Sequence, residues 1–303
     1  MSIKIIKKGL SDSIQDQGRY GYQHLGIQPN GCMDFISAWL GNYILRNKIQ
    51  NPVIELHFPS SHLQFEKEYT ICITGANFVP VINEKSVELN TPIQVKPKDI
   101  LSMLQPIEGK TSYIAIKGDF NDPMWLNSYS YNGIRLDKDQ IIHCEPYNDY
   151  IILEQAGQHE LIEQMQQLVF NNHTPIRFLP GPGWNHLREN SLLDLLNQSF
   201  KITAQTNRMG FNIIGPKLEL NIPNTFLSSA VTKGTLQLLP NGDIIVLMAD
   251  HQTIGGYANL GQIILVDLPR FTQMKPDKPF HFELTDLDKA NQLYRNIYEQ
   301  FQY

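Results

Sequence analysis

Charge is scarce in this chain, and so are long apolar runs and cysteines. Of its 303 residues only 18% are Asp, Glu, Lys or Arg, and 25 basic residues stand against 30 acidic ones. Nucleic acids and anionic membranes need a basic surface, so the formal charge of −5 argues against both as partners. No apolar run approaches the roughly 18 residues that a membrane-spanning helix requires.

The three cysteines, Cys32, Cys72 and Cys144, are widely spaced and odd in number. This pattern argues against a disulfide framework and fits a reducing compartment. Residues 1–6 lack the apolar segment of a signal peptide. We therefore expect a cytoplasmic protein.

Common catalytic and binding motifs are missing as well. The sequence has no Gly-x-x-x-x-Gly-Lys phosphate loop, no Gly-x-Ser-x-Gly serine, no His-Glu-x-x-His helix and no paired Cys-x-x-Cys. These absences exclude the best-known nucleotide, serine-hydrolase and zinc signatures. No metal site is expected.

What the chain does contain is enough apolar sequence for a sizeable core. Hydrophobic residues make up 42% and aromatic residues 10%, and 303 residues correspond to about two domains. We expect an N-terminal domain over residues 1–150, a Gln-rich connection over 151–175 and a C-terminal domain over 176–303 that ends in a helix.

The apolar segments are mostly short, β-branched and separated by Gly, Pro and Asn, which predicts a mainly β protein with few helices. The absence of βαβ alternation favours barrels or sandwiches over a doubly wound sheet. Strands are expected over residues 3–6, 53–58, 69–74, 113–117, 141–144, 176–179, 236–239, 244–248 and 263–267. Helices are expected over residues 33–45, 161–170, 185–198 and 286–301, the last capped by Thr285. Asn241-Gly242 predicts a hairpin whose two turn residues both have positive φ.

Residues 13–34 form the first of three segments that are unusually rich in glycine and polar side chains. Four glycines there let the backbone approach a ligand closely, while Asp16, Arg19, His24 and Asp34 supply charge and proton transfer. The same composition fits a surface loop that its Asp and Arg residues merely brace. Both interpretations stay open.

The other two segments are shorter. In residues 206–212, Arg208 offers a planar fork for a carboxylate or phosphate, or pairs with a neighbouring acid at a strand edge. In residues 247–257 a buried strand runs directly into Asp250 and His251, and polar groups at a strand end are typical of preorganised sites. A histidine there can equally be a hydrogen-bonded structural residue.

Together these segments resemble the KipA/PxpC family, also called allophanate hydrolase subunit 2 or biotin-dependent carboxyltransferase-like proteins. The family's Ser-Ile-Gln-Asp, Gly-Arg, Gly-Tyr, His-x-Gly and Gly-x-Met-Asp motifs match residues 13–34. Its Arg-Met-Gly motif matches 208–210, and Ala-Asp-x-Gln-Thr-x-Gly-Gly-Tyr matches 249–257. Smaller matches are Glu55, residues 74–76 and residues 179–182. The chain departs from the family at His251, where Arg is usual, and at residues 127–130, where Gly-Ser-Arg-Ser-Thr is common. It also departs at residues 118–119, where Gly-Gly is usual, and at residues 258–259, where a Pro-containing sequence usually follows the Tyr.

The resemblance implies two cyclophilin-like β-barrel domains and a role as the C subunit of 5-oxoprolinase. Such a protein works with a KipI/PxpB-like partner and a PxpA-like partner to convert 5-oxo-L-proline to L-glutamate. The assembled complex would use ATP, with Mg²⁺ as a further candidate. Two alternatives remain: a biotin-dependent carboxyltransferase module of the urea or allophanate type, and a non-catalytic regulator that binds a KipI-like kinase inhibitor.

The resemblance also implies roles for the matched residues. Arg19 and Arg208 would clamp a carboxylate or phosphoryl group, and Asp16 and Asp250 would orient them or accept a proton. The expected catalytic residues are Asp16, Arg19, His24, Arg208 and Asp250. The residues expected to bind a small amide or lactam substrate are Gln15, Asp34, His251, Gln252, Thr253, Gly255, Gly256 and Tyr257.

Overall fold

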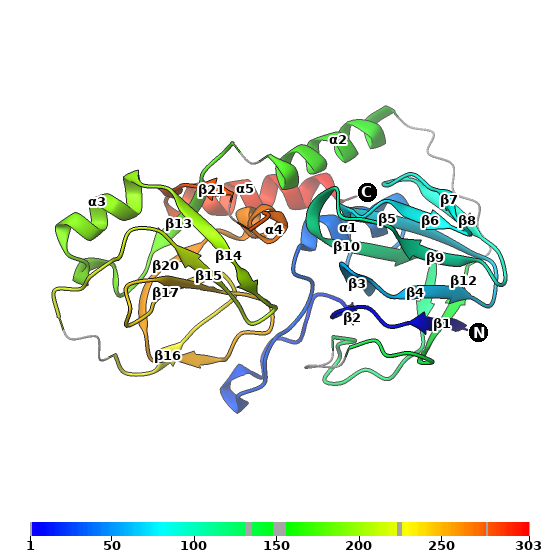
Figure 1. Cartoon of the computed structure of the whole chain (residues 1–303), viewed down its shortest axis with the longest axis horizontal. Coiled ribbons are helices and arrows are strands. Elements are labelled where there is room, and N and C mark those ends of the chain that lie inside the picture. Colours follow the sequence, from blue (N-terminus) through cyan, green and yellow to red (C-terminus); the bar gives the residue numbers. More distant parts are fainter. Residues whose placement is uncertain are drawn as a thin grey trace. The chain divides into compact units, whose positions relative to one another are not determined.

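The computed structural model describes residues 2–130, 135–147, 156–171, 173–222, 226–276 and 278–302. The chain divides into two compact units (Figure 1): unit 1 comprises Met1–Arg19 and Asn30–Phe170, and unit 2 comprises Tyr20–Pro29 and Asn171–Tyr303. Strands account for 36% and helices for 21% of the structure. The predicted mainly β class is confirmed.

Unit 1 contains twelve described strands and two helices. The strands are β1 (Ser2–Lys7), β2 (Ser13–Gln15), β3 (Val53–His57), β4 (His62–Phe65), β5 (Tyr69–Asn77), β6 (Pro80–Ile82), β7 (Lys85–Ser86), β8 (Pro92–Val95), β9 (Ile100–Met103), β10 (Glu108–Ile116), β11 (Gly118–Phe120) and β12 (Ile141–Pro146). The helices are α1 (Phe35–Ile44) and α2 (Ala156–Phe170).

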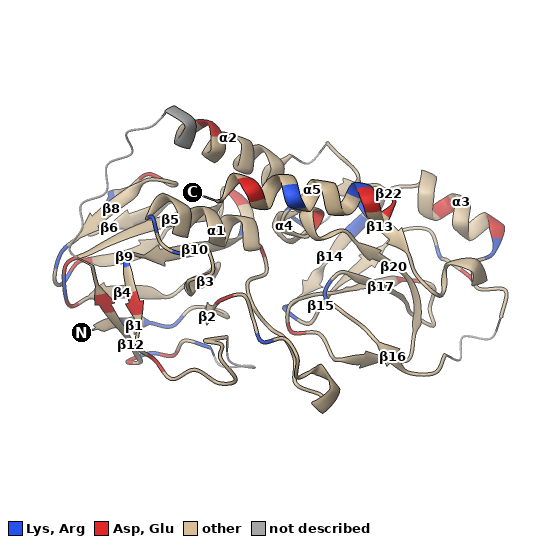
Figure 2. Ribbon diagram, turned by 180° about the vertical axis from the view of Figure 1, so that it is seen from behind, with Lys and Arg blue, Asp and Glu red and all other residues tan. Residues whose placement is uncertain are grey.

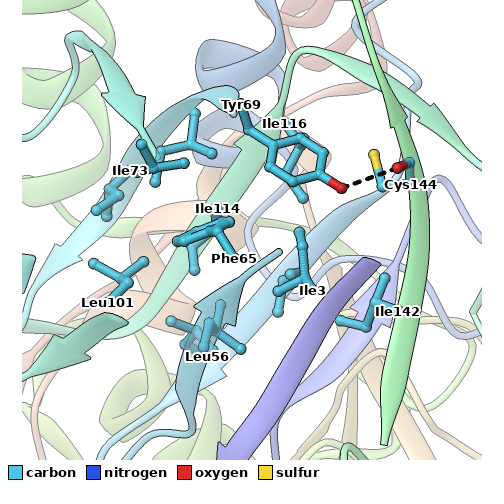
Figure 3. Close-up of a cluster of buried hydrophobic side chains, with 14 of the residues drawn as sticks. Ile3, Leu56, Phe65, Tyr69, Ile73, Leu101, Ile114, Ile116, Ile142 and Cys144 are labelled. Carbon is cyan, nitrogen blue, oxygen red and sulfur yellow. Dashed lines mark hydrogen bonds between the residues drawn. The ribbon is translucent and has the colours of Figure 1, made fainter. Parts of the chain in front are cut away.

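The strands of unit 1 form two sheets around one apolar core. One sheet has the order β11-β12-β1-β4-β9-β6-β7 and the other has the order β2-β3-β10-β5-β8. Because side chains alternate along a strand, Ile3 of the first sheet and Ile114 of the second both point into this core, where neither is exposed (Figure 3). The Tyr69 hydroxyl donates to the Cys144 carbonyl over 3.0 Å and so links the two sheets.

Helix α1 lies against β5 and β10 of the second sheet (Figure 1). Every residue of α1 except Tyr43 is buried. Gly41 allows the close approach, because a Cβ there would lie only 3.1 Å from the Ala115 Cβ and 3.2 Å from the Thr74 hydroxyl oxygen. The Thr74 hydroxyl donates to the Ser37 carbonyl over 2.6 Å and holds the helix in place.

Unit 2 contains ten described strands, three α-helices and three 3-10 helices. The strands are β13 (Ile176–Pro180), β14 (Phe200–Thr206), β15 (Gly210–Ile214), β16 (Ser229–Ala230), β17 (Thr235–Leu238), β18 (Ile244–Leu247), β19 (Ile254–Gly255), β20 (Ala258–Ile263), β21 (Pro279–Phe280) and β22 (Phe282–Leu284). The helices are η1 (Gln23–Leu25), η2 (Trp184–His186), α3 (Glu189–Asn197), η3 (Leu265–Asp267), α4 (Leu268–Gln273) and α5 (Leu287–Gln300).

Eight strands of unit 2 form a nearly closed barrel sheet, with the order β21-β14-β15-β18-β17-β20-β13-β22. Its two edge strands, β21 and β22, are separated by His281 alone, so the chain itself joins the edges. Packed aromatic rings fill the core beneath them, with the centroids of Phe280 and Phe282 5.0 Å apart and those of Phe200 and Phe282 5.3 Å apart. Strands β16 and β19 form a separate two-stranded sheet.

Most predicted elements overlap observed ones, but the strand expected over residues 263–267 is wrong. Strand β20 ends at Ile263, and the 3-10 helix η3 and helix α4 follow it. The reason is the fully buried Asp267, whose carboxylate accepts the backbone N–H of Arg177 over 2.8 Å and the Arg177 Nη2 over 2.6 Å. Such a pair needs the chain to turn inward at Asp267, and an apolar pattern does not show this.

Three local predictions also need correction. Asp286, not Thr285, caps α5 and accepts the backbone N–H of Lys289 over 2.8 Å. Helix α3 begins at Glu189, later than expected, because the residues before it form η2. The hairpin between β17 and β18 is present, but only Gly242 has a positive φ, +84°, and the backbone N–H of Gly242 donates to the Leu239 carbonyl over 3.0 Å.

The observed units divide the chain differently from the expected domains in two places. Residues 20–29 belong to unit 2, and α2, expected within a connection, belongs to unit 1.

Among the described residues, none of the helices combines the length and the hydrophobicity that a membrane span requires. Figure 2 shows that charged residues are sparse on the ribbon and that both signs occur along α5.

Candidate functional site

The predicted site residues fall into two groups, one in each unit. In unit 1, Asp16 follows β2 and is buried, and its carboxylate accepts several hydrogen bonds. Its carboxylate accepts the backbone N–H of Gly18 over 2.7 Å and that of Tyr129 over 2.7 Å. It also accepts the hydroxyls of Ser128 over 2.7 Å and Ser130 over 2.9 Å. Four donors therefore surround this carboxylate, and it braces the loop. For Asp16 this agrees with the structural one of the two interpretations that the sequence left open for residues 13–34.

The same bonds show that residues 127–130, a stretch that departs from the family pattern, hold the Asp16 carboxylate in place. Ser128 and Ser130 lie 112 and 114 residues from Asp16 in the sequence, and both are fully buried. A second bond, from the Asp16 backbone N–H to the Ser130 hydroxyl oxygen over 2.9 Å, closes the link. Sequence reasoning missed these serines because no local pattern connects positions so far apart.

Arg19 is also part of this bracing. Its guanidinium lies over the Trp125 ring, 4.7 Å from the centroid, and its Nε donates to the Trp125 carbonyl over 3.4 Å. Its Nη1 donates to the Asn30 side-chain oxygen. The residue is only 2% exposed. These contacts favour a structural cation in unit 1 over a clamp for an incoming anion.

Asp34, which the sequence predicts to bind substrate, caps helix α1. It is fully buried, and its two carboxylate oxygens accept the backbone N–H and the hydroxyl of Ser37 over 2.9 and 2.5 Å. Its own backbone N–H donates to the Tyr113 hydroxyl over 2.7 Å, which donates to Glu55 over 3.0 Å.

Gln15, also expected to bind substrate, is buried on β2, and its Nε2 donates to the Ser13 hydroxyl over 2.8 Å.

In unit 2, Arg208 and Asp250 form a two-pronged ion pair. Arg208 Nε and Nη2 lie 2.9 and 2.8 Å from the two carboxylate oxygens of Asp250. The backbone N–H of Asp250 donates to the Arg208 carbonyl over 2.7 Å, which aligns the two segments at the end of β18. The pair is only partly exposed, 12% and 17% for the two side chains. Asp250 therefore takes the Nε–Nη2 edge of the guanidinium and holds the group in one plane, which is the pairing with a neighbouring acid that the sequence also allowed.

The segment 20–29 reaches this pair through Gln28, whose Nε2 donates to the Asp250 carbonyl over 2.7 Å. The sequence did not single out Gln28, because its partner lies 222 residues away. His24 lies on η1 of the same segment, where it is exposed. Unit 2 therefore contains Arg208, Asp250 and His24, whereas Asp16 and Arg19 belong to unit 1.

His251 is buried, only 2% exposed, and is hydrogen-bonded through Nδ1 to the Gln252 carbonyl over 2.5 Å. A carbonyl can only accept, so Nδ1 carries the proton and Nε2 is left as an acceptor in the neutral ring. Burial lowers the pKa of His251, and the bond to the carbonyl only partly opposes this effect. The ring is therefore neutral near pH 7 and does not replace the positive charge of the usual arginine.

The remaining predicted residues of unit 2 lie on or beside β19. Gly255 pairs with Ser229 of β16 and is buried, whereas Gly256 and Tyr257 are exposed. The Thr253 carbonyl accepts the backbone N–H of Val231 over 3.2 Å.

Gln252 is half-buried, and its Nε2 approaches the Oε1 of Gln237 on β17 at 3.5 Å. The sequence treated Gln237 only as a hairpin residue, because its burial beside this segment is a tertiary feature.

Within the described ranges, no group of three or more His, Cys, Asp or Glu side chains is arranged to hold a metal ion.

The three cysteines form no disulfide and are all buried. Burial raises the pKa of Cys72, and burial together with nearby acidic groups raises that of Cys144 to about 12. Neither thiol is therefore a ready nucleophile at neutral pH.

Comparison with known proteins places this arrangement in a family. A family model described as the carboxyltransferase domain, subdomain A and B, matches residues 25–284. The chain belongs to this carboxyltransferase family. A Haemophilus influenzae relative, described as the C subunit of 5-oxoprolinase, is 31% identical over 93% of this chain and 91% of the relative. An Escherichia coli relative with the same description is 28% identical over 98% of this chain and 97% of the relative.

A solved structure of the K. lactis urea amidolyase has the same fold as this carboxyltransferase-family chain, with a TM-score of 0.88 over 99% of the chain at 23% identity. This chain spans only 20% of that larger protein. The likeness therefore concerns one part of a longer protein. It confirms the fold that the sequence motifs implied.

Proposed function

We propose that this protein is the C subunit of an ATP-dependent 5-oxoprolinase, which converts 5-oxo-L-proline to L-glutamate. The observation that carries the proposal is end-to-end similarity. The relatives described as C subunits of 5-oxoprolinase match this chain over nearly the whole length of both proteins, whereas the urea amidolyase match covers a fifth of that protein.

The site chemistry of unit 2 supports the proposal. 5-Oxo-L-proline carries a carboxylate and a planar lactam, so a site for it needs an oriented cation and amide-binding groups. Asp250 holds the Arg208 guanidinium in one plane, and we assign this guanidinium to the substrate carboxylate. The neighbouring amides of Gln252 and Gln237 are suited to the lactam.

The proposal includes partners. A KipI/PxpB-like protein and a PxpA-like protein would complete the enzyme, and ATP with Mg²⁺ would be used by the assembled complex. Within this proposal the chain's own residues bind and orient the substrate, exclude water from it and stabilise charge that develops on the amide oxygen.

The test is reconstitution. This chain is co-expressed with candidate KipI/PxpB-like and PxpA-like partners, and glutamate formation is measured with and without ATP and 5-oxo-L-proline. We expect turnover that needs both compounds. Arg208→Ala should lower kcat/KM by about tenfold or more, because a bond to a charged group is lost. Arg188→Ala is the matched control, since Arg188 is an exposed arginine of unit 2 paired with Glu219. Equal activity of the two variants would contradict the assignment of Arg208.

A second candidate, carboxyl transfer to an amide by way of biotin, is favoured by the description of the matching family model and by the urea amidolyase fold. The same preparation distinguishes the two. Turnover that requires a biotinylated carrier and bicarbonate supports carboxyl transfer. A tight complex with a KipI-like protein and no turnover supports the regulatory alternative.

A further inference from the structure

A buried glutamine in the barrel wall of unit 2 has a hydrogen-bond donor that it does not use. Gln237 lies in the middle of β17 and is 1% exposed. No described group accepts a bond from its Nε2. Buried side-chain amides are nearly always satisfied, so an unused donor at this depth points to a missing acceptor.

An unused acceptor lies on the next strand. Asn259 of β20 is directly opposite Gln237 in the β17–β20 register. Its Oδ1 is buried and also accepts no bond from the described groups. Directly opposite residues of an antiparallel pair project from the same face of the sheet, with Cβ atoms about 5 Å apart. One unused donor and one unused acceptor therefore project from the same face of the barrel wall, next to a register shift between Leu236 and Gln237.

This face is not the hydrophobic side of β17. Leu236 and Leu238 alternate with Gln237 and are paired with the buried Val246 and Ile244 of β18. Gln237 is paired with the half-buried Ile245. The Gln237 and Asn259 amides consequently lie on the opposite face, toward the polar segment 250–257.

Two glycines keep other side chains away from these amides. A Cβ at Gly255 would lie 2.3 Å from Gln237 Nε2, and a Cβ at Gly181 would lie 2.6 Å from Asn259 Oδ1. Gly181 belongs to residues 179–182, a motif to which the proposed function gives no task. At Gly181 the backbone adds to the restriction, because the same Cβ would lie 2.6 Å from the Asn259 carbonyl oxygen and 2.9 Å from the Gly261 nitrogen, whereas at Gly255 the close atom is the end of the flexible Gln237 side chain.

We propose that Gln237 and Asn259 bind one edge of a cis-amide ligand. Gln237 Nε2 donates to the ligand's carbonyl oxygen, and Asn259 Oδ1 accepts the ligand's N–H. A lactam or a urea presents both groups on one edge, so one ligand molecule would satisfy both buried atoms. That the ligand is 5-oxo-L-proline rests on the proposed function, whereas the amide-binding site itself does not.

A bound water, which both donates and accepts, or a direct bond between the two amides would also satisfy the two atoms. These cases and a bound ligand predict different results. If a water or a direct bond satisfies the amides, added lactam should not shift their NMR signals, and Gln237 is a structural residue. A ligand site makes Gln237 important for binding and unimportant for folding.

The first experiment is a titration of the full chain, labelled with ¹⁵N, with 5-oxo-L-proline and separately with urea. The side-chain NH₂ signals of Gln237 and Asn259 are assigned by their loss in Gln237→Met and Asn259→Leu. We expect saturable shifts of both pairs of signals with one or both probes. If neither probe moves them at concentrations up to tens of millimolar, a water or a direct bond satisfies the amides and the inference is overturned.

The second experiment compares Gln237→Met with Gln262→Met in the reconstituted enzyme. Gln262 is a satisfied glutamine of β20, which donates to the Lys233 carbonyl over 2.7 Å and accepts the Thr235 hydroxyl over 3.0 Å. We expect Gln237→Met to raise KM for 5-oxo-L-proline by about three- to tenfold without lowering Tm. Gln262→Met should lower Tm and leave KM unchanged.

The outcomes separate the two proposals. If the native complex does not turn over 5-oxo-L-proline, the proposed function fails and the titration alone decides the amide site. If the native complex is active and Gln237→Met keeps a native KM, the amide site is wrong while the function stands. A fall in Tm for Gln237→Met as large as that for Gln262→Met shows a structural glutamine and also overturns the inference.

Discussion

Asp12 is a carboxyl group that folding has placed in an unfavourable environment. It is 1% exposed and accepts the backbone N–H groups of His57 over 2.7 Å and Ser61 over 2.5 Å. Burial outweighs these bonds and raises its pKa to about 6, and the nearby Glu55 adds to the shift. The protonated form is therefore favoured in the folded protein relative to the unfolded chain.

This shift predicts a pH dependence of stability. The folded pKa lies above the unfolded value of 3.8, so the contribution of Asp12 is fully present below about pH 4 and is lost as the pH rises through 6. The loss should be about 3 kcal/mol by pH 7. Urea unfolding from pH 4 to 7 should show a steeper fall in stability for the native protein than for Asp12→Asn.

Asp288→Asn, at an exposed position of α5, is the control for the Asp12 measurement and should follow the native curve. Parallel curves for the native protein and Asp12→Asn would show that the carboxyl is charged in the fold. Such a result would contradict the raised pKa.

At the scale of the element, helix α1 depends on its first residue. Asp34 begins the helix and uses both carboxylate oxygens on Ser37. We therefore expect Asp34→Ala to lower the free energy of unfolding by about 1–2 kcal/mol, whereas Asp34→Ser should retain most of it. Chemical denaturation measures both variants.

Asp286→Ala provides the comparison, because Asp286 caps the largely exposed helix α5 through the backbone N–H of Lys289. Its effect should be smaller than that of Asp34→Ala. If Asp34→Ala instead folds normally and raises KM for the substrate, Asp34 does not stabilise the helix and binds substrate, as the sequence predicts.

For the molecule as a whole, the division of the chain into units does not follow sequence order. Residues 20–29 belong to unit 2 although residues on both sides of them belong to unit 1. Gln28 provides one bond for this placement, to the Asp250 carbonyl. The segment therefore helps to support the loop that holds Arg208 and Asp250.

We expect Gln28→Leu to increase hydrogen exchange at the backbone amides of Asp250 and His251 by about fivefold, since one hydrogen bond contributes roughly 1 kcal/mol to local stability. Mass spectrometry of exchanged peptides measures the effect. Gln23→Leu is the matched control, because Gln23 bonds to Gly21 within the segment. Identical exchange in both variants would show that Gln28 does not support the loop.

The sequence predicted the class of fold because strand patterns are local. Alternation places Ile3 and Ile5 of β1 on one face whatever the rest of the chain does. It also located the glycine-rich motifs and Asp250, since these lie at strand ends. It placed η3 wrongly, because the turn there depends on a bond between Asp267 and Arg177, 90 residues away.

The candidate site was predictable only in part for the same reason. Arg208 and Asp250 were both identified from their local motifs, and the structure shows them paired. The serines that hold Asp16 and the partner of Gln28 were not identifiable. The unused amides of Gln237 and Asn259 were also invisible, because burial without a partner is a property of the packed barrel.

The sequence by itself determined a mainly β protein with little charge, few cysteines and a set of motifs that resemble one carboxyltransferase-like family. Only the tertiary structure decided which of those polar residues are structural. Asp16, Arg19 and Asp34 are occupied by hydrogen bonds within unit 1, whereas the Arg208–Asp250 pair lies partly exposed in unit 2. The physical reason is that composition and spacing set what a side chain can bind, while burial and long-range contacts set what it does bind.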